Sequence, residues 1–463
     1  MIKQTAVPFG LRDKIGYLMG DIGNDFTFIF ASTYVMVFYS KVMGISTGLI
    51  GTMFVIARCL DAFTDIGMGR IVDRMPTEEN GRFRPWILRM CGPVALVSFL
   101  MYQSGMQNAP YRLKVIYMFV TYILWGSVFY TSINIPYGSM VSVLSPDVKD
   151  RSSLSVFRSM GASIASIGIT TVTPLIVYYT DANGNQLVSA ASFTRIAGFF
   201  SILAVVAYLL CYYLTTERVV IESCKEKTKI SRGTFLSEIF SSRALIGIIF
   251  SAILLLLATL MTQGVNNYLF ADYFRNTKAL AAFGMLQLPV MLILALVSTR
   301  LSVRFGKKEC SAAGMAFAGV LFVCIGLSRI TNVYLFMALV FLAMLGMYFL
   351  QMQCYAMVSD VIDEKEVRTG VRDDGTIYGI YSFARKIGQA IAGGISGWAL
   401  AFIGYDELAA AQSTQVADSI YKLATLFPGI VYLLCAAVLT FLYPLGKRQV
   451  EYNVAELEKR RRG

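Results

Sequence analysis

Histidine is absent from this 463-residue chain, and charged residues make up only 15% of it. The first absence excludes His-ligated metal sites and His proton relays. The second sets the chain apart from soluble globular proteins, in which about 25% of residues are charged. The eight cysteines show no C-x-x-C spacing, so neither a zinc site nor a disulfide scaffold is indicated. With 56% hydrophobic residues and a mean hydropathy of +0.60, the composition is that of an integral membrane protein.

Apolar stretches recur along the chain at the length needed to cross a bilayer, about 20 residues each. About twelve of them are present, which predicts an all-α polytopic membrane protein with twelve transmembrane helices. The first stretch exceeds the apolar core of a signal peptide and lacks an A-x-A-like cleavage site, so we expect it to be retained. The approximate limits of the twelve are 15–40, 46–69, 86–105, 113–140, 154–180, 195–214, 243–270, 279–299, 311–328, 332–358, 376–403 and 421–444.

The net charge of +12 would suggest a nucleic acid partner in a soluble protein, so the placement of the 41 Lys and Arg residues decides its meaning. With the N-terminus in the cytoplasm, about 29 of them fall in cytoplasmic segments and about 8 in outside loops. This asymmetry follows the positive-inside rule. It predicts that both termini are cytoplasmic, and it gives no reason to expect nucleic acid.

A polar segment near the middle of the chain, residues 215–242, separates six spans from six. The expected organisation is an N-terminal six-helix half at 1–214, this cytoplasmic linker loop, a C-terminal six-helix half at 243–446, and a basic cytoplasmic tail at 447–463. Two six-span halves are typical of parallel-repeat transporters, whose substrate site lies at the membrane midplane between the halves. The basic tail is expected to lie near anionic membrane lipid.

Four carboxylates occur within the first two spans: Asp21, Asp25, Asp61 and Asp65. At about 2.5–3.5 kcal/mol for each charge at a helix centre, they would cost roughly 10–14 kcal/mol if unpaired. They must therefore be paired, protonated or hydrated. Each pair is spaced i,i+4, which places both members on one face of a helix.

Asp61 and Asp65 are the candidates for a cation site, because two carboxylates on one face supply hard oxygen ligands. Thr64 adds a hydroxyl beside Asp65, and Thr131 on the fourth span can supply another. A small cation or a shared proton would suit this site. The alternative is an internal salt-bridge network, since Arg58 lies three residues before Asp61.

Intramembrane cations and polar aromatic side chains recur in other spans. Arg158 lies in the fifth span, and Arg385 and Lys386 lie in the eleventh. A Lys that faces acids of the other half would sense both the cation site and the substrate. For Arg385, the alternative interpretation is snorkelling toward an interface. A sugar needs hydrogen-bonding groups and ring faces, although most of the 26 tyrosines are expected in the core or at interfaces. The substrate-binding candidates are Asn24, Asp25, Asn134, Arg158, Tyr355, Tyr381 and Ser382.

Several motifs together resemble the glycoside–pentoside–hexuronide:cation symporter family of the major facilitator superfamily. The resemblance extends over nearly the whole chain, and its specificity comes from the combination of motifs. The motifs are Gly16-Tyr17, Gly20-Asp21, Asn24-Asp25-Phe26, Ala57-Arg58, Asp61-Ala62-Phe63, Asp65, Gly81-Arg82-Phe83-Arg84-Pro85-Trp86, Asn134-Ile135-Pro136-Tyr137-Gly138-Ser139, Gly370-Val371-Arg372, Gly375, Tyr378 and Ser382-Phe383-Ala384-Arg385-Lys386.

The resemblance implies the major facilitator fold, a sugar site between the halves, and symport driven by Na⁺, Li⁺ or H⁺. Asp61 and Asp65 match the cation-site carboxylates of the family, with Thr64 and Thr131 at neighbouring ligand positions. Two further residues, Asp25 and Arg158, match sugar-contacting positions of melibiose-type permeases. The family's lysine between the two sites corresponds to Lys386.

Two departures from melibiose-type members bear on the ligands. Asn134 and Gly138 stand where those members have an aspartate and a tryptophan, as in relatives that look like glucuronide and pentoside carriers. An α-galactoside is therefore not indicated. Thr64 replaces the Asn of Na⁺-using relatives, which leaves Na⁺ and H⁺ both open.

The sequence thus predicts a secondary active symporter of a glycoside, pentoside or hexuronide, with H⁺ or Na⁺ as coupling ion and no other cofactor. We expect it to function as a monomer in a bacterial-type cytoplasmic (inner) membrane. A membrane enzyme is disfavoured, because no nucleophile motif or paired metal-ligand spacing occurs. The remaining alternative is a lipid or other organic-solute carrier of the same fold, against which the polar, tyrosine-rich spans argue.

Overall fold

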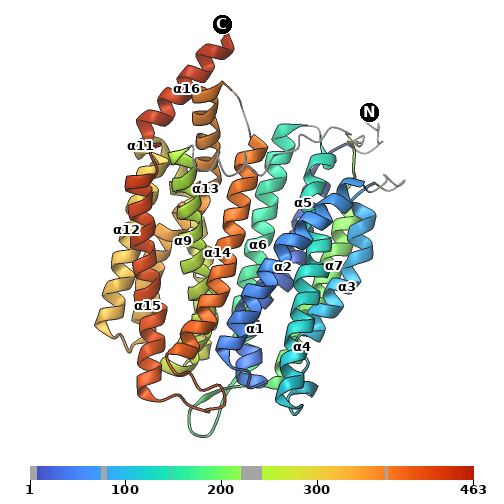
Figure 1. Cartoon of the computed structure of the whole chain (residues 1–463), viewed down its shortest axis with the longest axis vertical. Coiled ribbons are helices and arrows are strands. Elements are labelled where there is room, and N and C mark those ends of the chain that lie inside the picture. Colours follow the sequence, from blue (N-terminus) through green and yellow to red (C-terminus); the bar gives the residue numbers. More distant parts are fainter. Residues whose placement is uncertain (1–7, 75–80, 146, 220–241, 371–373, 463) are drawn as a thin grey trace. The chain divides into compact units, whose positions relative to one another are not determined.

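The computed structural model describes residues 8–74, 81–145, 147–219, 242–370 and 374–462, and long helices account for most of them (Figure 1). Within these ranges, nine helical stretches are long and apolar enough to cross a membrane. Outside the nine lie three helices of similar length: α1 (Leu11–Val37), α2 (Thr47–Arg74) and α14 (Asp374–Phe402). The first two contain the carboxylates predicted above. The number twelve itself stays a prediction.

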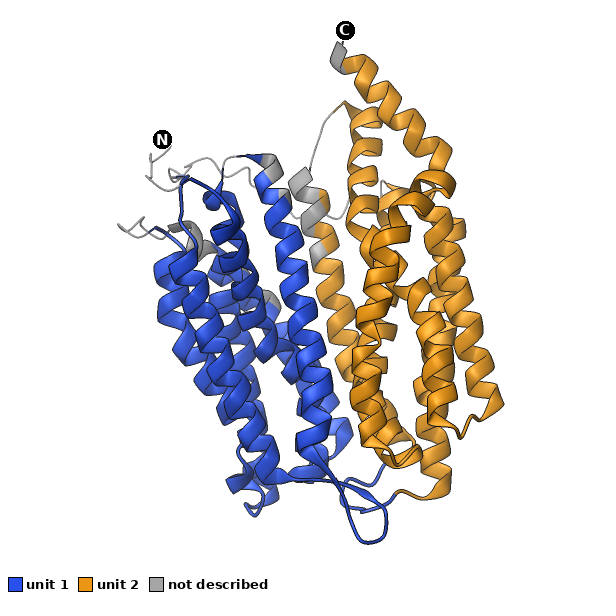
Figure 2. Cartoon of the chain, turned by 180° about the vertical axis from the view of Figure 1, so that it is seen from behind, with its two compact units in different colours: residues 1–227, 405–411 blue, residues 228–404, 412–463 orange. Residues whose placement is uncertain are grey.

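The chain forms two compact units (Figure 2). Unit 1 comprises Met1–Lys227 and Tyr405–Ala411, and unit 2 comprises Thr228–Gly404 and Gln412–Gly463. The remaining helices of unit 1 are α3 (Arg84–Leu100), α4 (Tyr111–Ile123), α5 (Thr131–Leu144), α6 (Val148–Val177) and α7 (Ala190–Leu214). A short hairpin of β1 (Tyr178–Thr180) and β2 (Gln186–Val188) joins α6 to α7. Besides α14, unit 2 contains α9 (Arg243–Tyr268), α10 (Thr277–Met285), α11 (Gln287–Phe305), α12 (Lys307–Ser328), α13 (Val333–Thr369), α15 (Thr414–Ala437) and α16 (Lys447–Arg462).

The two units repeat the same packing scheme. In unit 1, α1 packs against α6 and α7; in unit 2, α9 packs against α14 and α15. Both α1 and α9 also end in a five-residue π-helical segment, Phe38–Val42 in one case and Leu269–Tyr273 in the other. The described helices of the two units thus follow a common packing order.

Two residues that follow α7, Glu217 and Arg218, connect several helix ends of unit 1 by hydrogen bonds and an ion pair. Arg218 forms a buried ion pair with Asp13 of α1 at 2.9 Å and also donates to the carbonyl of Leu144 at the end of α5. Its neighbour Glu217 accepts from the backbone amides of residues 82–84, at 2.7–2.8 Å, at the start of α3. Gly81, at φ 109°, allows this approach, because a Cβ there would lie 2.5 Å from the Glu217 carboxyl carbon. The predicted linker therefore begins with residues that fix three helix ends.

The segment Tyr405–Ala411 follows α14 in the chain but belongs to unit 1 by its contacts. Glu407 accepts from the backbone amide of Thr47, the first residue of α2, at 2.7 Å. Tyr405 is buried, and the ammonium of Lys41 lies 5.7 Å from its ring centroid. This assignment differs from the contiguous second half expected from the sequence, because hydropathy carries no information on which helix ends a loop contacts.

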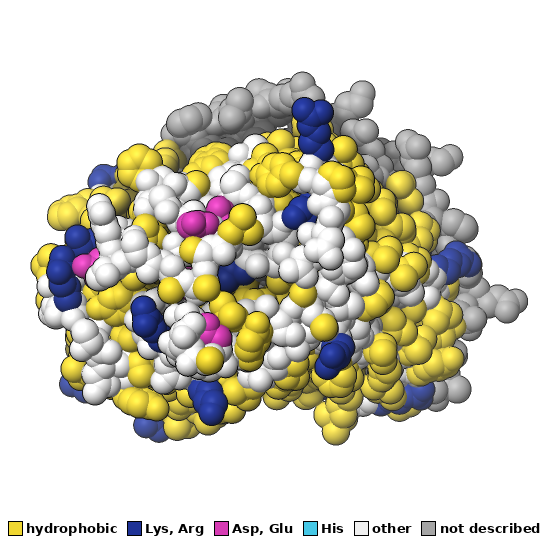
Figure 3. Space-filling model, turned by 90° about the horizontal axis from the view of Figure 1, so that it is seen from below, with side chains coloured by type: hydrophobic (Ala, Val, Ile, Leu, Met, Phe, Trp, Pro, Cys, Tyr) yellow, Lys and Arg dark blue, Asp and Glu magenta, His cyan; other side chains and the backbone are white. Residues whose placement is uncertain are grey.

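Positive charge is dispersed on the face of the molecule seen in Figure 3. The described Lys and Arg side chains there are scattered among hydrophobic and neutral polar ones.

Candidate functional site

The two carboxylates of α2 predicted to bind a cation face two hydroxyls from the helical stretch that runs from α4 to α5. Ser127 donates to Oδ1 of Asp61 at 2.6 Å, and Thr131 donates to Oδ1 of Asp65 at 3.0 Å. Both pairs are spaced i,i+4, so the contacts form two successive rungs between the helices. Ser127 lies in the π-helical segment Leu124–Tyr130, which separates α4 from α5. Such segments change the register of the side chains that follow and are frequent at functional sites.

Asp61 is charge-balanced within its own helix. Arg58 donates to its Oδ2 at 3.0 Å, and the guanidinium carbon lies 5.5 Å from the ring centroid of Phe28 on α1. The two hypotheses drawn from the sequence, a salt bridge and a cation site, therefore both involve Asp61. A cation would share Asp61 with Arg58 and Asp65 with the Thr131 hydroxyl.

Thr64 lies beside these carboxylates but donates its hydroxyl within α2. Its Oγ1 is 3.3 Å from the carbonyl of Leu60 and 3.2 Å from that of Asp61. The oxygen keeps lone pairs that can accept or ligate. The available donor set of Asp61, Asp65, Thr131 and Thr64 is made only of hard oxygens, which suits Na⁺ and excludes a soft metal site. In the part of the chain that is described, no group of three or more Cys, Asp or Glu residues is arranged to hold a metal ion.

A second polar cluster lies between α1, α5, α6 and α7. The Nε of Arg158 pairs with Oδ1 of Asp21 at 2.9 Å, and its guanidinium lies 5.4 Å from the ring centroid of Tyr137. Tyr137 in turn stacks on Tyr17 and donates to its carbonyl at 2.6 Å. One nitrogen of the Arg158 fork is thus used for positioning, and 42% of this side chain is exposed. Arg158 keeps donors for a ligand.

The structure brings two further sugar-site candidates on α1 to this cluster. Asp25 is half-buried, one turn after Asp21, and lies within the electrostatic range of Asp21 and Arg158. Asn24 is buried, and its Oδ1 accepts from the hydroxyl of Tyr208 at 2.8 Å. Its Nδ2 has no hydrogen-bond partner among the described residues. Asn134 is half-buried on α5, and no described contact joins it to these groups.

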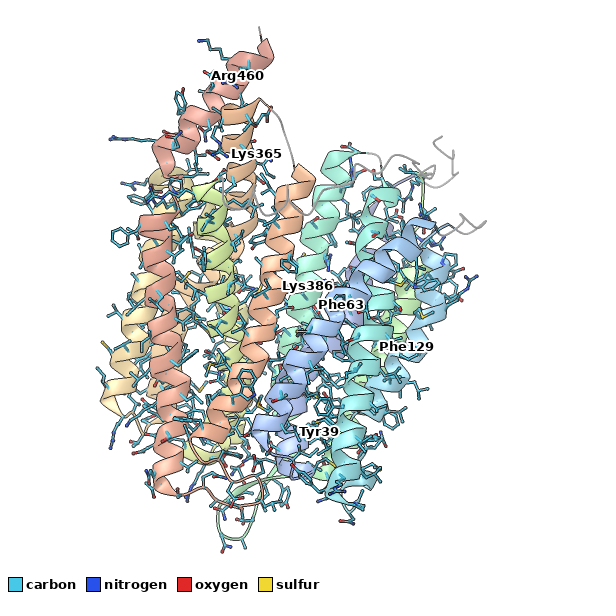
Figure 4. All side chains as sticks on the ribbon, viewed as in Figure 1. Tyr39, Phe63, Phe129, Lys365, Lys386 and Arg460 are labelled. Atoms are coloured by element: carbon cyan, nitrogen blue, oxygen red, sulfur yellow. The ribbon has the colours of Figure 1, made fainter. Side chains whose placement is uncertain are left out.

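Unit 2 contains the other predicted polar groups. The rings of Tyr355 on α13 and Tyr381 on α14 meet edge to face at a centroid distance of 5.7 Å. Arg385 donates to the Tyr355 hydroxyl. Lys386 is exposed and lies about midway along α14 (Figure 4). The side chain of Ser382 lies outside the described part of the chain.

Sequence reasoning did not single out Ser127 or Tyr208. Ser127 precedes Thr131 by four residues, the same spacing as between the two carboxylates, so the matched spacing was a usable signal. Tyr208 lies in a strongly apolar stretch with nothing to separate it from ordinary core tyrosines. Its role as partner of Asn24 needed the tertiary structure.

Comparison with known proteins agrees with this architecture. A family model described as "MFS/sugar transport protein" matches residues 16–447. The isoprimeverose transporter of Lactiplantibacillus pentosus is 30% identical, with 99% of this chain and 93% of the relative covered. A glucuronide carrier protein homolog of Escherichia coli strain K12 is 27% identical, with 97% and 96% covered.

Solved structures show the same fold at low identity. A bacterial homolog of the human lysosomal transporter Spinster has a TM-score of 0.67 at 11% identity, covering 96% of this chain and 99% of that one. The xylose transporter XylE from E. coli has a TM-score of 0.63 at 13% identity, with 96% and 98% covered. The predicted all-α membrane fold and the predicted superfamily are both confirmed. The chain belongs to the MFS/sugar transport protein family and is an integral membrane protein of transporter type.

Proposed function

We propose that this protein is a symporter that takes up a glycoside, pentoside or hexuronide together with H⁺ or Na⁺. The observation that carries the proposal is the two hydrogen bonds by which Ser127 donates to Asp61 and Thr131 donates to Asp65. A transporter that moves only a neutral solute has no need of two carboxylates within one apolar bundle, where each charge is costly. The names of the sugar-transporting relatives support the substrate class.

In this proposal the cation binds to Asp61, Asp65, Thr131 and Thr64, with Ser127 as an additional oxygen. Carboxylate and hydroxyl oxygens suit Na⁺, and a carboxylate hydrogen-bonded to a hydroxyl equally suits a proton. Either ion reduces the negative charge of the site, which lowers the free-energy cost of keeping these carboxylates within the membrane during the conformational change. The ion gradient can therefore drive the conformational cycle.

The sugar would be held by the polar side chains that the sequence predicts as substrate-binding. Asp25 accepts from sugar hydroxyls, Arg158 donates from its exposed nitrogens, and Asn24 and Asn134 can do both. The candidates in unit 2 are Tyr355, Tyr381 and Ser382, with Lys386 as the residue that couples the two ligands. Alternating access at a midplane site then exposes the bound sugar to one side at a time.

We further propose that the protein works as a monomer in the bacterial cytoplasmic membrane, with both termini in the cytoplasm. The excess of Lys and Arg in the segments on that side supports this orientation. No cofactor other than the coupling ion is needed.

Uptake into proteoliposomes tests the function directly. Radiolabelled glycosides, pentosides, uronides and a lysolipid are offered under a Na⁺ gradient alone, a pH gradient alone, or neither. We expect one sugar class to accumulate under one of the two gradients, with loss of accumulation when an ionophore dissipates that gradient. Gradient-independent movement of lysolipid, with no sugar accumulated, would instead support a lipid carrier of the same fold.

A further inference from the structure

Arg385 differs from two other arginines that lie well inside long helices of this chain, Arg58 on α2 and Arg158 on α6. Arg58 pairs with Asp61 at 3.0 Å, and Arg158 pairs with Asp21 at 2.9 Å. In the described ranges, no carboxylate lies within ion-pair distance of Arg385. Its contacts are instead with Tyr355, whose hydroxyl accepts from its Nη1 and whose ring centroid lies 5.5 Å from the guanidinium carbon.

The position of this guanidinium does not suit an interfacial role. Arg385 follows the first residue of α14, Asp374, by eleven positions, which is about 16 Å along a helix. Tyr355 precedes the last residue of α13, Thr369, by fourteen positions, or about 21 Å. Since α13 ends and α14 begins on the same side, both groups lie well inside the bundle. The side chain is therefore held on a tyrosine of the neighbouring helix and does not extend toward a helix end.

Tyr355 fixes the guanidinium without using up its donors. Arginine carries five N–H donors in a planar fork, and one of them goes to the Tyr355 hydroxyl. Stacking on the ring restrains the fork further, and the edge of Tyr381 lies against the same ring. The remaining donors match the two oxygens of a carboxylate in a bidentate arrangement.

The aromatic surroundings indicate the rest of the ligand. The side chain of Tyr355 is 46% exposed and can offer its face or hydroxyl to a sugar ring beside the guanidinium. Arg385 is half-buried, and no carboxylate of the described ranges pairs with it, so a sugar acid that stacks beside it fits this position better than a neutral sugar does. A neutral glycoside would leave the charge uncompensated.

We propose that Arg385, held by Tyr355, binds the carboxylate of the substrate, so that the transported sugar is a uronic acid or its glycoside. This inference rests on the proposed sugar transport. It assigns Arg385 as the residue that sets the preference for an acidic over a neutral sugar.

The first arm of the test uses the unaltered protein and matched ligands. Binding is measured by isothermal titration calorimetry for the methyl glycosides of glucuronic and galacturonic acid, and for the corresponding uronamides. The amide keeps the shape of the ligand but removes its charge. We expect the acid of one pair to bind about tenfold or more tightly than its amide, the range expected for charge-assisted hydrogen bonds. Equal affinity, or tighter binding of the amide, in both pairs overturns the proposal.

The second arm uses Arg385→Gln, Arg385→Lys and Tyr355→Phe, with Arg329→Gln as control. Arg329 pairs with Asp418 at 3.6 Å and is 64% exposed, so its loss removes one cation without touching the site. We expect Arg385→Gln to abolish the preference for the acid, Arg385→Lys to retain part of it, and Tyr355→Phe to reduce it about two- to tenfold. The control should keep the full preference.

The outcomes separate this inference from the proposed function. If neutral glycosides accumulate under an ion gradient and Arg385→Gln leaves their affinity and that of the acids unchanged, the symporter stands and the assignment of Arg385 is wrong. If Arg385→Gln weakens the binding of acid and amide equally, the guanidinium stabilises the structure of the site and does not bind the substrate carboxylate. The assignment is then again wrong. If no sugar of either kind accumulates, the proposed function itself fails.

Discussion

Units 1 and 2 share a packing scheme but distribute their charges differently. Unit 1 places ion pairs at the middle of its helices, Arg58 with Asp61 and Arg158 with Asp21. The described pairs of unit 2 join residues nearer to helix ends, such as Lys307 with Asp360 and Arg329 with Asp418. The repeated scaffold therefore fixes where side chains can lie, whereas the chemistry at those places has diverged between the halves.

This difference suggests a division of labour. The acids that can bind a cation, and the arginines that balance them, lie on helices of unit 1. The mid-helix cations Arg385 and Lys386 lie on α14 of unit 2. The predictions that follow test this comparison.

The largest expected effect comes from removing the cation-site carboxylates of unit 1. We expect Asp61→Asn and Asp65→Asn each to reduce gradient-driven sugar accumulation by about 100-fold or more, since even outer-shell changes weaken metal sites by 10–100-fold. Exchange of sugar without a gradient should be affected less, because it needs the sugar site but not net ion movement. Counterflow and gradient-driven uptake in proteoliposomes measure the two separately.

Asp181→Asn is the control for this prediction, because Asp181 lies in the hairpin between α6 and α7 and binds the local backbone amides of Asn183 and Asn185. Its uptake should match that of the unaltered protein. Normal sugar accumulation in both carboxylate variants would remove the assignment of the cation site to unit 1.

The next effect concerns the mid-helix ion pair of the same unit. Breaking a buried pair by removing one partner costs about 3–5 kcal/mol, and we expect Arg158→Met to fall at the lower end because this arginine is partly exposed. Replacing Asp21 by Asn as well should recover much of the loss in unfolding free energy. A double-mutant cycle read by thermal unfolding in detergent measures the coupling, and additive effects would show that the pair contributes nothing.

Sugar binding separates the two partners of this pair. Arg158→Met should also weaken sugar affinity by about 1–3 kcal/mol, since a ligand group loses its donor. Asp21→Asn should act on stability more than on affinity, because Asp21 contacts the Nε and leaves the other nitrogens in place. Similar losses of affinity in both variants would place Asp21 at the sugar itself.

The sequence predicted the helical membrane fold well, because composition and long apolar stretches depend on the bilayer more than on tertiary contacts. It was less informative on helix length: the predicted span 332–358 is part of α13, which continues to Thr369. The added turns carry Asp360, Glu364 and other polar residues, which extend a helix without extending its apolar part. Hydropathy measures the embedded length only.

The candidate site shows the same limit. Spacing alone placed Asp61 and Asp65 on one face, and the position of Thr131 on the fourth span suggested a partner for them. The sequence did not predict that Arg158 pairs with Asp21, or that Glu407 accepts from the backbone amide at the start of α2. Both contacts join segments that are far apart in the chain. The role of Lys386 as the residue that couples the two ligands stays a prediction.

A smaller effect is expected from neutralising the mid-helix lysine of unit 2. If Lys386 exchanges between the acids and the substrate, Lys386→Gln should abolish the mutual enhancement of cation and sugar binding, which typically amounts to about 5–150-fold. Sugar affinity with and without saturating cation gives this ratio for each protein. Because linkage is reciprocal, cation affinity with and without sugar must change by the same factor. An unchanged ratio in the variant would show that another residue couples the ligands.

The smallest effect is expected at the exposed ion pair of unit 2. Arg329 and Asp418 are 3.6 Å apart, and their side chains are 64% and 36% exposed. Such pairs are worth about 0–1 kcal/mol, because solvent screens the attraction and two flexible side chains must be ordered. Asp418→Asn should therefore shift the unfolding free energy by less than about 1 kcal/mol, and this shift should shrink further as salt is raised. A loss of unfolding free energy as large as that of Arg158→Met would mean that the position of an ion pair along a helix does not determine its contribution to stability. The contrast between the two units would then rest on their ligand sites alone.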